Sequence, residues 1–552
     1  MNPIAASGGH VKARAVSTST ATTLFCIAIA AMALRIGWLF WHGPGEVGWD
    51  GAEYARLATS LFSGHGYVGL RGTTQFVFPP FYSLTIAALL PFTGDALRAG
   101  VAVSLISGTA LIFPAYGIAS LVYGMRAGYA AAAIAAVLPF AVQLSTVVLA
   151  DMLFLTLVTT GMYLLLRTVV SPRYADAALA GVAFGLAYLT RPEGLLLELL
   201  AVGVVLVLAL TRVVKPQRAA LLALAVILPF AILAAPYVAF LSSHAGHLRV
   251  EGKSVLNLDI GLRMDRGLSY TVAADAIDEN LRVTGPELAQ DYYFEPAGRV
   301  APSLSTILTF GLKNTLRHVR EIGHVAFSRL CGSVLLVALA IVGFAAGPWD
   351  GRRVRLQLLL VGYGLVITLA LASVFHFWDR YFVGYVPLLI VWSANGVAVI
   401  TRLLPRAGRW ARIAPLALTA LVLVAFLFST KTGFTDDDGR SVAERQAGSW
   451  LAQHGGENAR IASISDQAVY YAKGIWFMLP WAPSDDAALR YVRGQTPDFI
   501  VLDRDDASER PYVIAWMKSG VPDARARVVY SVADDGSPTP TVQVVSLSGT
   551  VK

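Results

Sequence analysis

The feature that most constrains this chain is a series of apolar runs, each long enough to cross a bilayer, which recur from about residue 20 to residue 430. A bilayer core about 30 Å thick requires about 20 apolar residues of helix. Only 14% of the 552 residues are charged and 56% are hydrophobic, whereas soluble proteins carry about 25% charged residues. The sequence therefore predicts a polytopic α-helical membrane protein.

About eleven spans are predicted when roughly 20 residues are assigned to each. They lie near 20–41, 98–122, 127–148, 151–167, 177–190, 194–211, 219–240, 324–346, 356–375, 382–402 and 413–430. Two of the outer connections are long, at 43–97 and 241–323. Residues 1–435 are thus predicted to form one membrane module that contains both loops.

Lysine and arginine positions indicate how the spans are oriented, because cytoplasmic loops are enriched in both residues. Basic residues occur in alternate loops, so all of these loops can be cytoplasmic at once. They are Lys12, Arg14, Arg126, Arg167, Arg173, Arg212, Lys215, Arg218, Arg352, Arg353, Arg355, Arg402, Arg406, Arg409 and Arg412. The other loops and the C-terminal tail then lie outside, and the net charge of +8 reflects basic loops and not nucleic-acid binding.

The C-terminal tail, 436–552, is rich in charged residues and has no spanning run. Helix-like stretches at 441–453, 485–493 and 509–518 alternate with apolar runs at 460–465, 498–503, 526–532 and 541–547. This alternation predicts a small extracytoplasmic α/β domain with a mostly parallel sheet. The tail contains no Gly-rich phosphate loop and no His or Cys group with metal-ligand spacing.

The first outer loop begins with a stretch of helical periodicity that starts at Trp49. Apolar residues follow one face of a helix from Tyr54 to Phe62, so we predict an amphipathic helix on the bilayer surface. Asp50 and Glu53 stand at its start, and the simplest interpretation is a capping box. A second helix is predicted over 82–90, ending at Pro91. In the second outer loop, helices are predicted over 275–281 and 304–318.

Ionisable residues at membrane depth are rare and mark candidate functional sites. Four groups lie near the predicted outer face: Asp50 with Glu53, Asp151, Arg191 with Glu193 and Glu198, and Asp379-Arg380-Tyr381. Each has a structural alternative, because Asp151 could cap its helix, Arg191 could snorkel or pair with Glu193, and Arg380 could lie in the interfacial belt. Arg35, inside the first span, could snorkel or bind a ligand. Together the four groups predict a site for an anionic, lipid-linked substrate beside a general base.

Several short motifs in this order are characteristic of one enzyme family. The first outer loop carries Asp50, Glu53-Tyr54-Ala55-x-x-Ala58, Gly64-His65-Gly66-Tyr67 and Phe78-Pro79-Pro80-x-Tyr82. Later come Asp151, Leu-Thr-Arg-Pro-Glu-Gly at 189–194, and Arg380-Tyr381. With these motifs, residues 20–400 resemble the GT-C membrane glycosyltransferases, especially the bacterial branch of aminoarabinose transferases and protein O-mannosyltransferases.

The resemblance implies an enzyme that takes a sugar from a polyprenyl-phosphate carrier outside the membrane and inverts its anomeric carbon. The family's first-loop aspartate matches Asp50, so the resemblance implies that Asp50 is the general base. Many relatives have Asp-Glu where this chain has Asp50-Gly51. The aminoarabinose transferases have lysine where this chain has Phe78, which counts against an aminoarabinose donor and a lipid A acceptor.

We therefore expect an inverting glycosyltransferase in the bacterial inner membrane, with a hydroxyl of a lipid, glycan or protein as acceptor. Asp50 and Asp151 are the expected catalytic residues, with Asp151 supporting the base or positioning the acceptor. The residues expected to bind substrate are Glu53, Tyr54, Tyr82, Arg191, Lys253, Arg380 and Tyr381. Because arginine and lysine can offset the charge of the leaving phosphate, we expect neither a metal ion nor a cofactor.

Two other functions remain open from the sequence. A transporter or flippase of lipid-linked sugars would need the same arginines but no general base. Transporters often contain internal repeats, and none is evident here. In the third interpretation the membrane part only anchors the C-terminal domain, but that domain lacks an evident set of catalytic residues.

Overall fold

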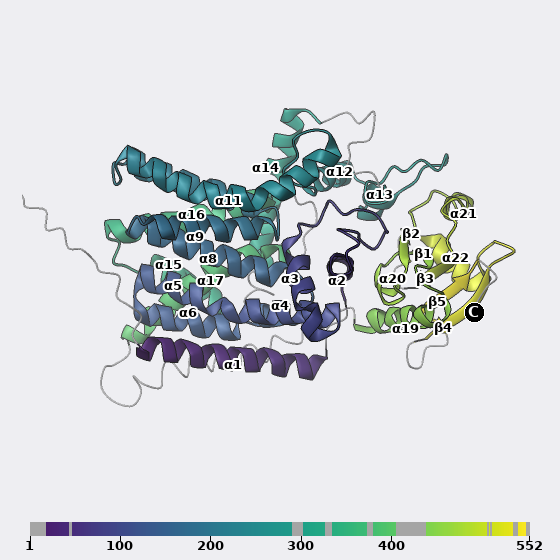
Figure 1. The fold of residues 1–552 in the computed structure, drawn as a ribbon, viewed down its shortest axis with the longest axis horizontal. Coiled ribbons are helices and arrows are strands. Elements are labelled where there is room, and N and C mark those ends of the chain that lie inside the picture. Colours follow the sequence, from purple (N-terminus) through teal and green to yellow (C-terminus); the bar gives the residue numbers. More distant parts are fainter. Residues whose placement is uncertain are drawn as a thin grey trace, which may run out of the picture.

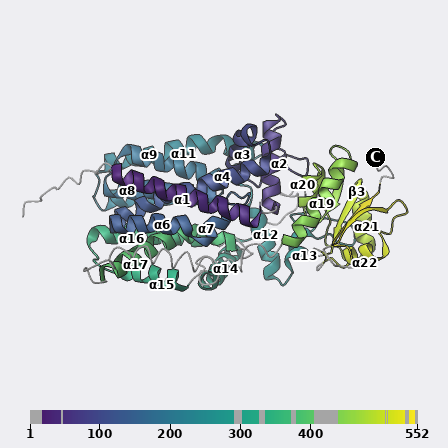
Figure 2. The ribbon, with the colours of Figure 1, turned by 90° about the horizontal axis from the view of Figure 1, so that it is seen from below.

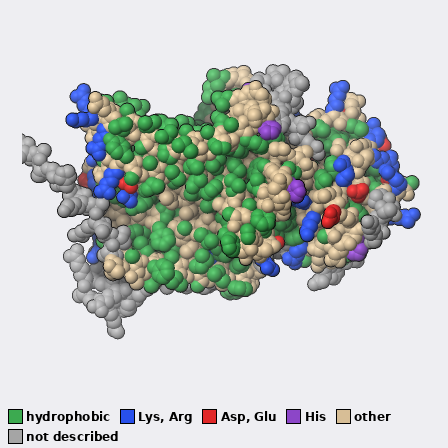
Figure 3. Space-filling view, in the orientation of Figure 1, with side chains coloured by type: hydrophobic (Ala, Val, Ile, Leu, Met, Phe, Trp, Pro, Cys, Tyr) green, Lys and Arg blue, Asp and Glu red, His purple; other side chains and the backbone are tan. Residues whose placement is uncertain are grey.

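The computed structural model describes residues 18–43, 47–289, 302–325, 334–371, 379–403, 438–504, 507, 510–533 and 539–547. Its larger part is a bundle of roughly aligned helices, and a small sheet with its own helices lies beyond one end of the bundle (Figure 1). Hydrophobic side chains cover the visible side of the bundle, and Lys and Arg side chains gather at its end opposite the sheet and also over the C-terminal domain (Figure 3). This distribution is the one expected of a membrane protein with basic cytoplasmic loops.

The bundle contains most of the predicted spans. Its helices are α1 (Thr18–His42), α4 (Ala96–Ala110), α5 (Ile112–Tyr123), α6 (Met125–Val137), α7 (Pro139–Leu144), α8 (Asp151–Val170), α9 (Tyr174–Tyr188), α10 (Gly194–Leu210), α11 (Pro216–Ala245), α15 (Val334–Ala345), α16 (Gly351–Ala370) and α17 (Val386–Leu403). Among the residues that the structure describes, six helical segments are long and apolar enough to cross a membrane, and shorter apolar helices accompany them. The predicted span 413–430 lies outside the described residues.

Arg35 lies inside the bundle and is fully buried. Pro139 has no amide N–H, so the helix bond that would have reached the Ala135 carbonyl is missing. Arg35 Nη2 donates to that carbonyl over 3.2 Å, and Nη1 donates to the Ala136 carbonyl over 2.8 Å. Another bond, from Nη2 to the Gly108 carbonyl, ties α1 to α4. Both predictions for Arg35, snorkelling and ligand binding, are therefore wrong, because backbone carbonyls at a helix break take up its donors.

The first outer loop contains α2 (Trp49–Phe62) and α3 (Phe81–Thr93). The α2 helix forms where its periodicity predicted it, but its apolar face does not lie on the bilayer. Tyr54 and Ala58 are at most 5% exposed because they pack in one cluster with residues of α3 and α4. The α3 helix continues through Pro91 to Thr93, so the predicted end at Pro91 is wrong; Gly94, with φ of 70°, ends it.

The second outer loop contains α12 (Ser254–Asp265), α13 (Tyr270–Asp275) and α14 (Leu304–Val325). The predicted helix at 304–318 is confirmed as part of α14. The predicted helix at 275–281 is wrong. Residues 276 and 277 instead form isolated bridges, with Trp481 and Val283, so main-chain pairing with another part of the protein replaces helical bonds.

The C-terminal domain has a five-stranded sheet in the order β2-β1-β3-β5-β4. The strands are β1 (Arg460–Ser463), β2 (Ile475–Met478), β3 (Phe499–Asp503), β4 (Arg527–Val532) and β5 (Val542–Ser546), and the helices are α19 (Asp438–His454), α20 (Gln467–Tyr471), α21 (Asp485–Gly494) and α22 (Pro511–Ser519). Strand β1 is parallel to β2 and β3, but β5 is antiparallel to β3 and β4. The α/β prediction is confirmed, whereas a mostly parallel sheet is wrong.

The C-terminal domain rests on both outer loops. Trp476 N donates to the Leu70 carbonyl over 2.9 Å, and Ile277 N donates to the Trp481 carbonyl over 3.0 Å. Arg56 of α2 donates to the Gly474 carbonyl over 2.7 Å. Helices α2 and α20 lie side by side in both ribbon views (Figures 1 and 2). Strand β2, at the edge of the sheet, is thereby joined to the membrane part.

Candidate functional site

Asp50 lies in the first turn of α2, at the end of the bundle that faces the C-terminal domain. The N-cap of this helix is Gly48, and no side chain caps it, so the capping-box interpretation of Asp50 and Glu53 is wrong. Gly51 explains the departure from Asp-Glu, because a Cβ there would lie 2.7 Å from the Val148 carbonyl. This close approach brings the start of α2 beside the segment that leads to Asp151.

Glu53 is buried and organises the rest of the first outer loop. Its Oε2 accepts from Leu70 N over 2.9 Å, and its Oε1 accepts from Gln75 Nε2 over 2.5 Å. Burial raises the pKa of Glu53, although these two donors and the nearby cations Arg71 and Arg56 oppose the shift. We therefore interpret Glu53 as an anchor for the loop and not as the residue that contacts substrate.

Tyr54 stands between the acidic groups and an aromatic cluster. Its ring meets those of Phe78 and Tyr82 edge to face, with centroids 5.0 and 4.9 Å away. Burial, and then the negative charge of Asp50, hold the pKa of Tyr54 well above its usual value. Tyr82 is fully buried, and its hydroxyl lies within hydrogen-bond distance of Ser104 Oγ on α4. Tyr54 is thus placed beside Asp50, and the ring of Tyr82 packs against the ring of Tyr54.

Asp151 and Arg191 form an ion pair that joins the start of α8 to the α9–α10 connection. Arg191 Nη1 lies 2.5 Å from Asp151 Oδ1, and Arg191 Nη2 lies 3.0 Å from Glu193 Oε1. The N-cap of α8 is Ala150, so the prediction that Asp151 only caps its helix is wrong. The alternative that Arg191 pairs with Glu193 is confirmed, but Arg191 binds Asp151 as well. Burial would lower the pKa of Arg191, but Glu193 and then Asp151 hold it above its usual value.

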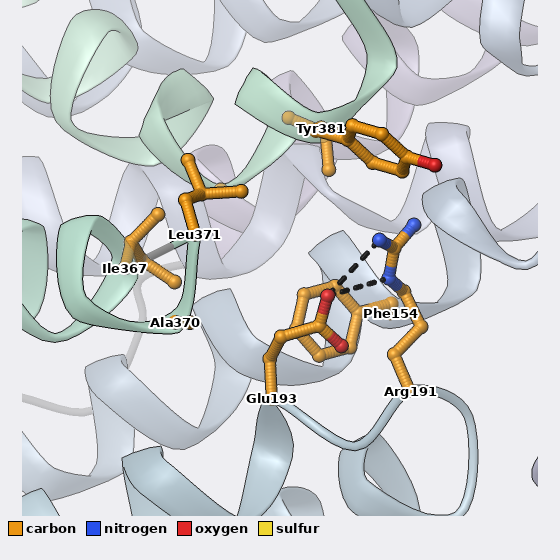
Figure 4. A pocket seen from close by; sticks show the side chains of 9 residues that line it. Phe154, Arg191, Glu193, Ile367, Ala370, Leu371 and Tyr381 are labelled. Atoms are coloured by element: carbon orange, nitrogen blue, oxygen red, sulfur yellow. Dashed lines mark hydrogen bonds and ion pairs between the residues drawn. The ribbon is translucent and has the colours of Figure 1, made fainter. Parts of the chain in front are cut away.

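Arg191 and Glu193 line a small pocket together with residues of α8, α16 and the 3₁₀ helix η3 (Asp379–Tyr385). The lining residues are Phe154, Arg191, Glu193, Ile367, Ala370, Leu371, Tyr381, Val383 and Gly384. Figure 4 shows the guanidinium of Arg191 between the Tyr381 ring on one side and Glu193 on the other. Arg191 and Glu193, which carry opposite charges, form the polar side of this pocket, and most of the other lining residues are apolar.

The two other predicted cations are Lys253, whose side chain the structure describes, and Arg380, of which it describes only the backbone. The ammonium of Lys253, from the second outer loop, lies 5.5 Å from the centre of the Phe78 ring. The positive charge of Lys253 is also close enough to contribute, after Arg191, to lowering the pKa of Glu193. The backbone of Arg380 lies in η3, next to Tyr381, but its side chain lies outside the described structure. Glu198, further along α10, is buried and has no hydrogen-bond partner among the described residues.

Sequence reasoning missed the charged residues that the C-terminal domain and the connecting loops bring here. Asp466 follows β1 and is 3% exposed. Burial, and then the negative charges of Glu53 and Asp50, hold the pKa of Asp466 well above its usual value. Arg71 lies 5.1 Å from the centre of the Trp476 ring. A signal for Asp466 was available, since ligands of α/β sheets bind at the carboxyl ends of parallel strands.

Comparisons with known proteins bear on the family resemblance and on the fold. Residues 78–233 match the family model described as dolichyl-phosphate-mannose-protein mannosyltransferase. A search of curated proteins gives no significant match. The fold is similar to that of ArnT from Cupriavidus metallidurans bound to undecaprenyl phosphate, with a TM-score of 0.57 and 14% identity over 96% of this chain and 98% of that chain.

A second solved structure is also similar. It is the oligosaccharyltransferase of Archaeoglobus fulgidus in complex with Zn and sulfate, with a TM-score of 0.59 and 14% identity over 94% of this chain and 73% of that chain. At these identities the likeness is one of fold. Within the described ranges of the present chain, no group of three or more His, Cys, Asp or Glu residues is placed to hold a metal ion.

Proposed function

We propose that this protein, whose resemblance to the GT-C membrane glycosyltransferases is confirmed by those matches, transfers a sugar from a polyprenyl-phosphate carrier to a hydroxyl acceptor. The relatives support this class of donor: the ArnT structure contains undecaprenyl phosphate, and the matching family model is that of dolichyl-phosphate-mannose-protein mannosyltransferase. Transfer would take place on the outer face of the bacterial inner membrane, where the C-terminal domain also lies.

The proposed reaction is a single displacement. The acceptor oxygen attacks the anomeric carbon while Asp50 takes its proton. The bond between that carbon and the carrier phosphate breaks, and polyprenyl phosphate leaves with the electron pair. Attack opposite to the leaving group inverts the anomeric carbon. A positioned base of this kind accelerates proton transfer by about 10²–10⁴-fold.

The observation that carries this proposal is the contrast between Asp50 and the other two carboxylates of the expected set. The two other carboxylates are Glu53 and Asp151. Both are buried, whereas the side chain of Asp50 remains partly exposed. Of these three, Asp50 is therefore the carboxylate that an acceptor hydroxyl can reach, and Tyr54 is placed to position that acceptor.

We propose that the pocket beside Arg191 receives the carrier phosphate. A guanidinium has five N–H donors, and Asp151 and Glu193 accept from Nη1, Nη2 and Nε. One N–H on each terminal nitrogen is left for a phosphate oxygen. The two carboxylates also offset the charge of Arg191, so Lys253 and Arg380 are proposed as the additional cations. Asp151 then acts by fixing the orientation of Arg191.

A transfer assay separates this function from its alternatives. The purified full chain is incubated with a panel of polyprenyl-phosphate hexoses and pentoses and with lipid, glycan and peptide acceptors. Release of polyprenyl phosphate together with a new glycosidic product supports the proposal, and the donor that reacts decides between hexosyl and pentosyl transfer. Movement of an intact donor across vesicles without product formation would instead indicate the flippase alternative.

A further inference from the structure

The α14 helix of the second outer loop has an apolar stripe that the described protein leaves uncovered. Leu304, Leu308, Leu312 and Leu316 recur every four residues, and each is 63–70% exposed. Residues at this spacing lie on one face of a helix. Val319 continues the same face and is 54% exposed. A stripe of this length on one helix is typical of a surface that binds another apolar phase.

A different face of α14 holds the helix on the protein. Phe310 and Asn314 are buried and lie four residues apart. Helix α14 contacts α16 and η3, both of which contribute residues to the pocket beside Arg191. The helix is therefore attached to the wall of the candidate site, and its leucine stripe points away from that attachment.

Basic residues form a third strip along the same helix. Lys313, Arg317 and Arg320 follow one another at intervals of four and three residues, and all three are exposed. Lys313 pairs with Asp265 of α12. An exposed leucine stripe flanked by basic side chains is the pattern of a helix that lies in the membrane interface. The long basic side chains can extend from that depth to lipid phosphates.

The position of α14 agrees with this pattern. It lies beside α12 at the end of the bundle that faces the C-terminal domain (Figures 1 and 2). By contrast, the protein itself covers Tyr54 and Ala58 on the apolar face of α2. Of the two outer-loop helices with amphipathic sequences, α14 is thus the one whose apolar face remains open.

We propose that α14 lies in the outer interface of the membrane, where its leucine stripe enters the acyl-chain boundary and its basic strip binds the phosphates of anionic phospholipids. Because α14 touches η3 and α16, the bilayer then holds one wall of the pocket at the depth of the lipid headgroups. This inference does not depend on the reaction that the site catalyses.

Depth-dependent fluorescence quenching tests the placement of the helix. The full chain, with Cys26 and Cys331 replaced by alanine, receives one cysteine at Leu308 or Leu312 for an environment-sensitive label. Thr306→Cys is the matched control, because Thr306 is exposed and lies seven residues before Lys313, on the basic strip. In vesicles, lipids spin-labelled on the upper acyl chain should quench labels at 308 and 312 strongly and the label at 306 weakly. Equal, weak quenching at all three positions would overturn the proposal.

Lipid selectivity tests the basic strip separately. With the label at 312, spin-labelled phosphatidylglycerol should quench more than spin-labelled phosphatidylcholine at the same mole fraction. Each basic residue near an anionic surface contributes about 1 kcal/mol, or about five-fold in local lipid enrichment. The double substitution Arg317→Gln with Arg320→Gln should remove most of this preference without changing the depth of the label. Equal quenching by the two lipids in the unsubstituted protein would contradict the binding of anionic phospholipids.

Discussion

The ion pair between Asp275 and Arg510 gives a quantitative test of how the C-terminal domain is held on the membrane part. Arg510 Nη2 lies 2.8 Å from Asp275 Oδ2, and both side chains are only 6% exposed. Asp275 ends α13 in the second outer loop, and Arg510 precedes α22. We predict that Asp275→Asn loosens this junction without unfolding either part.

The expected magnitude follows from the burial of the pair. Removing one partner of a buried ion pair leaves the other charge uncompensated and costs about 3–5 kcal/mol. Each 1.4 kcal/mol changes an equilibrium about tenfold, so the junction should open about two to three and a half orders of magnitude more often. Exposed pairs contribute far less, about 0–1 kcal/mol.

Native-state hydrogen exchange measures this opening directly. The amides of Ile277 and Trp481 are bonded across the junction, to the carbonyls of Trp481 and Asp275. Their exchange should accelerate by the predicted factor in Asp275→Asn. Asp486→Asn is the matched control, since Asp486 pairs with Arg490 within one helix and its side chain is 75% exposed. If Asp275→Asn accelerates exchange no more than Asp486→Asn does, the pair does not hold the domain.

Three further predictions concern single residues. Glu53→Gln should lower thermal stability by about 1–3 kcal/mol through loss of the bond from Gln75, whose own side-chain oxygen already accepts from backbone amides; an unchanged unfolding curve would contradict the anchor role. Arg191→Lys keeps the charge but loses the fork, so donor affinity in a direct binding assay should fall, and an unchanged Kd would remove Arg191 from the phosphate site. Burial, and then Asp275, raise the pKa of Glu287 to about 7. Because the folded protein binds the Glu287 proton more tightly than the unfolded chain does, this group stabilises the fold fully below the unfolded pKa of about 4.5, and the stabilisation is lost as the pH rises through 7. Glu287→Gln should therefore flatten the pH dependence of the free energy of unfolding between these two values. An unaltered slope would refute this prediction.

The sequence was sufficient to predict the elements and groups that depend on local patterns. Apolar length identifies the spans, and helical periodicity identifies α2. The convergence of Asp151 and Arg191 could be predicted because both flank spans at the same membrane face. That their side chains pair directly, with Arg191 Nη1 2.5 Å from Asp151 Oδ1, could not be predicted, because it depends on how two distant segments pack.

Errors arose where contacts between distant segments override local preference. An Asp followed three residues later by Glu fits a capping box, but here Glu53 binds Gln75 and Leu70, and the N-cap of the helix is Gly48. Arg35 donates to the Ala135 carbonyl, which lacks a helical partner because Pro139 has no N–H. Strand β2 has only four residues and was not predicted; its pairing with β1 places it in the sheet.

The most direct test of the account is the transfer rate of Asp50→Asn, measured beside its donor affinity. Asparagine preserves the size of the side chain but cannot take a proton at neutral pH. We predict normal donor binding and turnover slower by about two to four orders of magnitude. Asp95→Asn is the control, because Asp95 caps α4 through a 2.9 Å bond from Arg98 N and asparagine caps equally well, so its turnover should stay near that of the unsubstituted protein. If Asp50→Asn retains most of the transfer activity, Asp50 is not the general base and the proposed mechanism is wrong.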